Sequence, residues 1–154
     1  MNRVARAVIL FISQGAYVGR FPVAPGTAGT VVGMFLFLGM KDLAPVPYLT
    51  LCILVILVGI WTAGRAEIIL GCTDCSSIVI DEIAGYLVCM FMVPPGWVFV
   101  VSGFLLFRAF DIVKPWPLRR LEKLHGGPGV MLDDIGAGIY SNILLQLAAY
   151  YTLL

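Results

Sequence analysis

Charged residues are scarce in this sequence. They make up 12% of its 154 residues, whereas hydrophobic residues make up 60%, and an ordinary soluble domain carries roughly 25% charged residues. This composition excludes water as the main solvent, so we expect one integral membrane domain over residues 1–154. A basic excess is also missing, since the formal net charge is +1. Nucleic acid, which calls for a basic face, is therefore not an expected partner.

Cysteine and histidine are few as well. Cys72 and Cys75 form a C-x-x-C pair, but the sequence offers no second pair at the spacing of a zinc site. We therefore interpret both as loop thiols. The single histidine, His125, precedes two glycines in a predicted loop. We interpret it as structural or solvated, with protonation of a leaving group as the alternative.

The N-terminal segment contains no small-x-small cleavage site, although Arg3 and Arg6 precede a short apolar run. We expect an amphipathic helix at the membrane surface rather than a secretory signal. In this helix the bases would meet anionic lipid while Val4, Val8 and Phe11 face the apolar phase. A retained membrane anchor is the alternative.

Four windows contain no charged residue and predict the membrane helices. They cover residues 21–40, 43–64, 83–107 and 135–154. As a helix, the second window is long enough to cross a hydrocarbon core of about 30 Å. Pro94, Pro95 and Gly96 interrupt the third window, which indicates a helical hairpin with two short arms.

Local signals predict where these helices begin. Prolines in the first window move the expected start of its helix to Thr27 or Thr30. Asp133 or Asp134 is the expected N-cap of the last helix, because a carboxylate accepts hydrogen bonds from the free N–H groups there. The predicted fold is an all-α polytopic membrane bundle. It has about four spanning helices, an N-terminal interfacial helix and active-site loops on the cytoplasmic face.

The distribution of charge predicts the orientation in the membrane. With a cytoplasmic N-terminus, all Lys and Arg residues except Lys41 lie on the cytoplasmic side, in agreement with the positive-inside rule. All Asp and Glu residues except Asp42 lie there too. Acids contribute little to topology, so their gathering indicates a cation site or an ion-pair network at that face.

Two cytoplasmic segments begin predicted helices. Thr27 and Thr30 belong to a Pro/Gly-rich turn whose hydroxyl and N–H groups suit phosphate, with an ordinary helix cap as the alternative. Asp81 and Glu82 are adjacent acids at the start of a membrane helix, and Gly85 one turn later would let another backbone approach. For these acids we favour a metal site over an ion pair or a cap.

A third segment, residues 108–134, holds nearly half of the charges. Arg108, Asp111 and Lys114 follow at intervals of three, which places alternating charges on one face of a helix end. They indicate either a phosphate and metal site or a structural ladder of salt bridges.

Four motifs on this predicted face together resemble the bacterial phosphatidylglycerophosphatase A family. They are PGTAGT at residues 25–30, IVIDEIAG at 78–85, FRAFDIVKPWP at 107–117 and GGPGVMLDDIGAG at 126–138. The resemblance extends from about Gly19 to Ala148, and the last two motifs are the most specific. Cys75, Glu122 and Thr30 depart from the family's usual residues, but none of these changes removes a predicted ligand.

The resemblance implies an enzyme that hydrolyses phosphatidylglycerophosphate to phosphatidylglycerol and inorganic phosphate, with Mg²⁺ as its cofactor. It implies a multi-pass protein of the bacterial inner membrane, with membrane lipids as partners and an active site that faces the cytoplasm. Because hard carboxylate oxygens suit Mg²⁺, we assign the catalytic and metal site to Asp81, Glu82, Asp111, Asp133 and Asp134. We assign the substrate phosphate to Thr27, Thr30, Arg108 and Lys114.

Water is the expected nucleophile, and an aspartyl-phosphate intermediate is the alternative. The sequence lacks the D-x-D and Ser-Gly-His signatures of two covalent phosphatase classes, and it lacks the D-G-x-x-A-R pattern of phosphatidyl-alcohol phosphotransferases. A small structural or transport bundle with a cytoplasmic ion-pair network is the alternative from another class. A transporter would place ionisable groups near the membrane midplane, whereas this sequence keeps them at one end.

Overall fold

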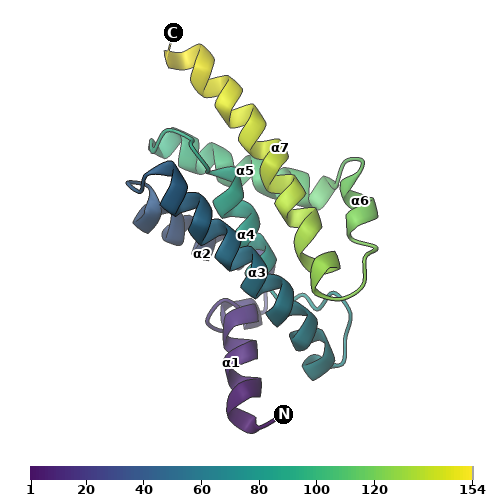
Figure 1. The fold of residues 1–154 in the computed structure, drawn as a ribbon. Helices are drawn as coiled ribbons and strands as arrows, with labels where there is room; N and C mark the ends of the chain where they lie inside the picture. The colour runs from purple at the N-terminus through teal and green to yellow at the C-terminus, as the bar shows by residue number, and fades with distance from the viewer. Residues whose placement is uncertain (154) are drawn as a thin grey trace.

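The structure, a computed structural model, describes residues 1–153, and within this range it is all α-helical (Figure 1). The elements are α1 (Arg3–Ser13), a 3₁₀ turn η1 (Val18–Arg20), α2 (Pro25–Met40), α3 (Pro45–Leu70), α4 (Ile80–Cys89), α5 (Trp97–Val113), α6 (Leu118–Leu121) and α7 (Gly127–Leu153). No strand occurs in the described residues. The predicted all-α class is confirmed.

The two longest helices, α3 and α7, pack against each other, and α4 packs against both α7 and α2 (Figure 1). α7 also contacts α5 and α6. The loop that follows α3 and the loop that precedes α7 lie at the same end of the bundle. The C-terminal end of α7 lies at the opposite end.

Among the described helices, α3 is the one that is both long and apolar enough to cross a membrane, with a mean hydropathy of 2.2. Its exposed surface includes Leu54, Leu57 and Trp61. α2 is apolar but shorter, and α4, with 10 residues, extends only about 15 Å. The structure supports membrane association through α3, and it does not confirm the predicted number of about four spanning helices.

The amphipathic character predicted for the N-terminal segment is present in α1. Val4, Val8 and Phe11 are exposed, whereas Ile9 is buried. α1 packs against α3. Its placement at a membrane surface remains a prediction.

Side chains from neighbouring helices bind the backbone carbonyls at the end of α4. Tyr48 Oη donates to the Leu87 carbonyl at 2.8 Å, and Asn142 Nδ2 donates to the carbonyls of Cys89 and Phe91, each at 2.8 Å. Unpaired carbonyls are costly in apolar surroundings, so these bonds allow α4 to end inside the bundle. The Pro-Pro-Gly sequence follows in the turn before α5, as the predicted hairpin requires.

Two glycines bring the backbones of α4 and α7 into contact. A Cβ on Gly85 would lie 2.7 Å from the carbonyl oxygen of Asp134, and a Cβ on Gly138 would clash with the carbonyl of Gly85. Only glycine allows this approach. The contact confirms the prediction made for Gly85, and it places α4 beside the part of α7 between Asp134 and Gly138.

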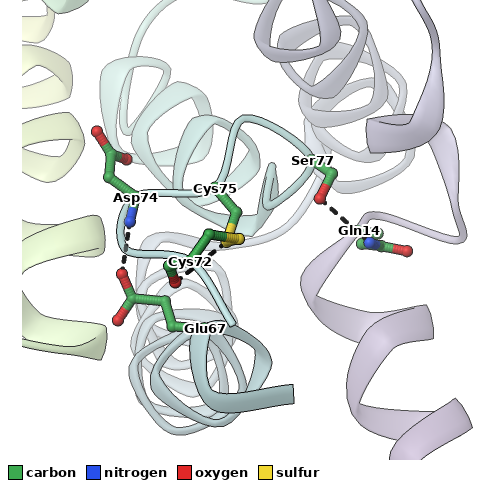
Figure 2. Close-up of a disulfide and its surroundings, with 6 residues drawn as sticks. All are labelled: Gln14, Glu67, Cys72, Asp74, Cys75 and Ser77. Carbon is green, nitrogen blue, oxygen red and sulfur yellow. Dashed lines mark hydrogen bonds between the residues drawn. A yellow bond between two sulfur atoms is a disulfide. The ribbon is translucent and has the colours of Figure 1, made fainter. Parts of the chain in front are cut away.

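Two local predictions were wrong. α2 begins at Pro25 rather than at Thr27 or Thr30, because proline fits the first turn of a helix, where its missing N–H is not needed. Cys72 and Cys75 form a disulfide within the loop after α3 rather than remaining free thiols (Figure 2). The disulfide closes a short ring in this loop.

The predicted start of the last helix was also wrong. α7 begins at Gly127, so Asp133 and Asp134 are not N-caps and lie about two turns inside the helix. Gly127 makes the earlier start feasible, because a Cβ there would clash with the Ile60 carbonyl of α3. The glycine-rich segment is thus a helix start packed on another backbone.

Candidate active site

Three carboxylates meet where the first turn of α4 packs against α7. Asp81 and Glu82 belong to α4 and Asp134 belongs to α7, and one oxygen from each lies within 4.8 Å of the others. Asp81 is 9% exposed and Asp134 is 4% exposed. Like charges this close and this poorly solvated repel one another, so this acidic cluster requires a cation or bound protons.

The two acids on α4 have little contact with solvent, and within residues 1–153 two of their oxygens have no partner. Asp81 Oδ1 and Glu82 Oε2 are buried without a hydrogen-bond partner among the described residues. Unpaired carboxylate oxygens are the ligands that Mg²⁺ prefers, so these residues fit a metal ion.

Arg108, on α5, lies beside the acidic cluster. Its Nη1 donates to Asp111 Oδ2 at 2.5 Å and lies 3.8 Å from Glu82 Oε1. Its Nε is buried and has no hydrogen-bond partner in the described part of the chain. Arg108 therefore keeps a donor free for an oxygen-rich ligand such as phosphate.

Lys114, just after α5, pairs with two acids. Its Nζ donates to Asp133 Oδ2 at 2.7 Å and lies 3.2 Å from Glu122 Oε1. Burial alone would lower the pKa of Lys114, but the bonds and charges of Asp133 and Glu122 raise it, so the ammonium stays charged. Asp133, like Asp111, thus pairs with a base, whereas the other three predicted metal ligands form the acidic cluster. Sequence reasoning assigned no role to Glu122.

The first turn of α2 borders the site. A Cβ on Gly26 would clash with Glu82 Oε1 and would lie 3.1 Å from Arg108 Nη1. Thr30 is fully buried, and its hydroxyl donates to the Gly26 carbonyl at 2.9 Å, within its own helix. Thr27 lies in the same first turns of α2. Sequence reasoning selected the two threonines and missed Gly26, although the Pro-Gly-Thr turn contained it.

The sequence of this chain is similar to that of one known protein family. The sequence profile of the family described as Phosphatidylglycerophosphatase A matches residues 11–149. No solved structure matches the chain.

Three curated relatives cover most of the chain. A Bacteroides thetaiotaomicron protein with the provisional name phosphatidylinositol-3-phosphatase is 38% identical over 150 residues, covering 92% of this chain and 93% of that protein. Phosphatidylglycerophosphatase A of Escherichia coli is 33% identical over 135 residues, covering 86% and 78%. Phosphatidylglycerophosphatase A of Haemophilus influenzae is 35% identical over 153 residues, covering 94% and 91%.

Proposed function

Because the chain belongs to the phosphatidylglycerophosphatase A family, we propose that its buried acidic cluster holds a Mg²⁺ ion for the hydrolysis of a lipid phosphate. The enzyme is a phosphoric-monoester hydrolase that converts phosphatidylglycerophosphate to phosphatidylglycerol and inorganic phosphate. The observation that supports the metal is the meeting of three carboxylates beside an arginine with a free donor.

Asp81, Glu82 and Asp134 are the proposed metal ligands, and a bound Mg²⁺ would supply positive charge that polarises the phosphoryl group. Arg108 would bind phosphoryl oxygens through Nε and its remaining N–H groups while Asp111 holds its orientation. Lys114, held by Asp133, would add a second positive charge. Both bases would stabilise the charge that develops on the phosphoryl oxygens, and water would be the nucleophile.

We propose that the protein is a multi-pass protein of the bacterial inner membrane whose active site faces the cytoplasm. α3 would span the bilayer, and α2, the α4–α5 hairpin and α7 would share its depth. All Lys and Arg residues except Lys41 would then lie on the cytoplasmic side, as the positive-inside rule favours. Membrane lipids would contact the exposed apolar face of α3.

Phosphate release from phosphatidylglycerophosphate tests the function. Purified protein in detergent should release phosphate when Mg²⁺ is present. Phosphate release should stop when EDTA is added and should recover when excess Mg²⁺ is restored. Release that persists after chelation would contradict the metal assignment. Absence of release under all conditions would contradict the hydrolase function and would favour a structural or transport role.

The Gly26→Ala variant should lower turnover about tenfold with little loss of thermal stability. The added methyl would displace the Glu82 carboxylate, which is the far end of a flexible side chain, and would leave the course of α2 unchanged. Initial rates and thermal unfolding in detergent measure the two effects. Gly39→Ala is the matched control, since a Cβ there meets no atom within 4 Å. Wild-type turnover in Gly26→Ala would show that this contact does not position Glu82.

A further inference from the structure

A cavity of about 410 Å³ lies between the loop after α3 and the loop before α7. Its lining includes Glu67 and Asp74 from the first side and Glu122, His125 and Asp133 from the second. Its volume falls within the range of about 300–1,000 Å³ that is usual for small-molecule sites. Neither loop alone encloses this space.

The cavity adjoins the proposed phosphate site. Asp133 and Glu122 line it, and the same two acids hold Lys114 through their other contacts. Asp133 is 5% exposed, and its Oδ1 is buried without a hydrogen-bond partner among the described residues. A buried acceptor at the boundary of the cavity remains available to a ligand that donates hydrogen bonds.

One wall of the cavity, which includes Glu67 and Asp74, belongs to a constrained loop and the helix end before it. The Asp74 N–H donates to Glu67 Oε1 at 2.7 Å, and the disulfide between Cys72 and Cys75 closes the loop around it (Figure 2). Asp74 has a left-handed backbone with φ of 49°. Figure 2 shows the carboxylates of Glu67 and Asp74 projecting to the same side, away from the disulfide. Two acceptor groups are therefore presented together.

The charge of the lining selects the kind of ligand. Four acids and one lysine line the cavity: Glu67, Asp74, Glu122, Asp133 and Lys123. An acidic lining repels a phosphate group, whereas carboxylates accept hydrogen bonds from hydroxyl groups.

On the basis of the proposed function, we propose that this cavity is the headgroup subsite of the enzyme and binds the hydroxyl groups of the polyol that carries the scissile phosphate. The polyol is either glycerol or a ring such as inositol, and both present the same hydroxyl chemistry. Phosphatidylglycerophosphate presents one free hydroxyl between its phosphates, and a ring polyol presents several. Glu67, Asp74 and Asp133 are the proposed acceptors.

The test measures kcat/KM for three lipids in detergent. They are phosphatidylglycerophosphate, its analogue with propanediol in place of glycerol, and phosphatidylinositol with a phosphate monoester on the ring. The wild type should prefer at least one hydroxyl-bearing lipid over the propanediol analogue by about tenfold, the effect of one charge-assisted hydrogen bond. Glu67→Gln and Asp74→Asn should reduce this preference several-fold, and Asp42→Asn is the matched control.

These variants are chosen to preserve the loop. The amide oxygen introduced by Glu67→Gln can still accept the Asp74 N–H, and asparagine tolerates a left-handed backbone. The preference is a ratio within one preparation, so it does not depend on the folded fraction. A wild type without the preference, or variants that keep it, would overturn the subsite. The polyol is identified by the hydroxyl-bearing lipid for which the enzyme's preference over the propanediol analogue falls most. Failure of the proposed function is distinct, because wild-type protein would then release phosphate from none of the three lipids.

Discussion

The Asp134→Asn variant is expected to lose about a thousandfold in phosphate release while the metal-free protein remains at least as stable as the wild type. Asp134 is buried within 4.8 Å of the oxygens of Asp81 and Glu82. An amide of the same shape removes one negative charge from the acidic cluster. The cation would be held less tightly, and repulsion among the carboxylates would be relieved.

Two measurements separate these effects. kcat at saturating Mg²⁺ reports the loss of catalysis, and thermal unfolding with EDTA reports the stability of the metal-free fold. Asp42→Asn is the matched control, because Asp42 is an exposed carboxylate between α2 and α3. Near wild-type turnover in Asp134→Asn would contradict the role of the acidic cluster. Strong destabilisation of the metal-free variant would instead assign Asp134 a structural role.

The Arg108→Lys variant is expected to lose about a hundredfold in kcat. Lysine keeps the positive charge but lacks the planar fork that can hold Asp111 and phosphoryl oxygens at the same time. The Nε donor, which is buried without a partner among the described residues, would also be lost. Because these contacts strengthen as charge develops on phosphate, kcat should fall more than KM rises.

The control for this substitution is Arg65→Lys. Arg65 is exposed on α3, so the exchange should leave kcat close to the wild-type value. Steady-state kinetics with phosphatidylglycerophosphate provide both constants. An Arg108→Lys enzyme with an unchanged kcat would show that charge alone is sufficient at this position, and the bidentate contact would be excluded.

Much of the arrangement of the candidate active site was predictable because its residues lie in local patterns. Adjacent acids at the start of a helix predicted Asp81 and Glu82, and Gly85 one turn later predicted the close helix contact that brings them to Asp134. Alternating charges in the last turns of α5 predicted that Arg108 would lie near Asp111. Each of these signals depends on helical periodicity, which the sequence displays directly.

The error at the start of the last helix concerns a contact with a distant part of the chain. The glycine-rich segment before Asp133 has the composition of a loop, but Gly127 packs on the backbone of α3 and begins α7 there. The bond from Asn142 to the carbonyl of Cys89 at the end of α4 is another distant contact, although the short helix itself was predicted. Neither partner is near in sequence, so local patterns carried no information about these contacts.

The sequence alone also could not show which acids pair with basic residues. Five carboxylates had the chemistry of metal ligands, and nothing in their spacing indicated that Asp133 would pair with Lys114. The cavity proposed for the headgroup was equally hidden, since Glu67 on α3 and Asp133 on α7 come together only in the folded bundle.

The most direct test of the acidic cluster is Mn²⁺ binding, measured by the loss of the free-ion electron paramagnetic resonance signal on titration into metal-free protein in detergent. Mn²⁺ shares the preference of Mg²⁺ for carboxylate oxygen. We predict saturable binding to the wild type, displacement by excess Mg²⁺, and binding weakened at least tenfold in Asp134→Asn. Equal binding by both proteins, or no binding by the wild type, would contradict a metal site at Asp81, Glu82 and Asp134.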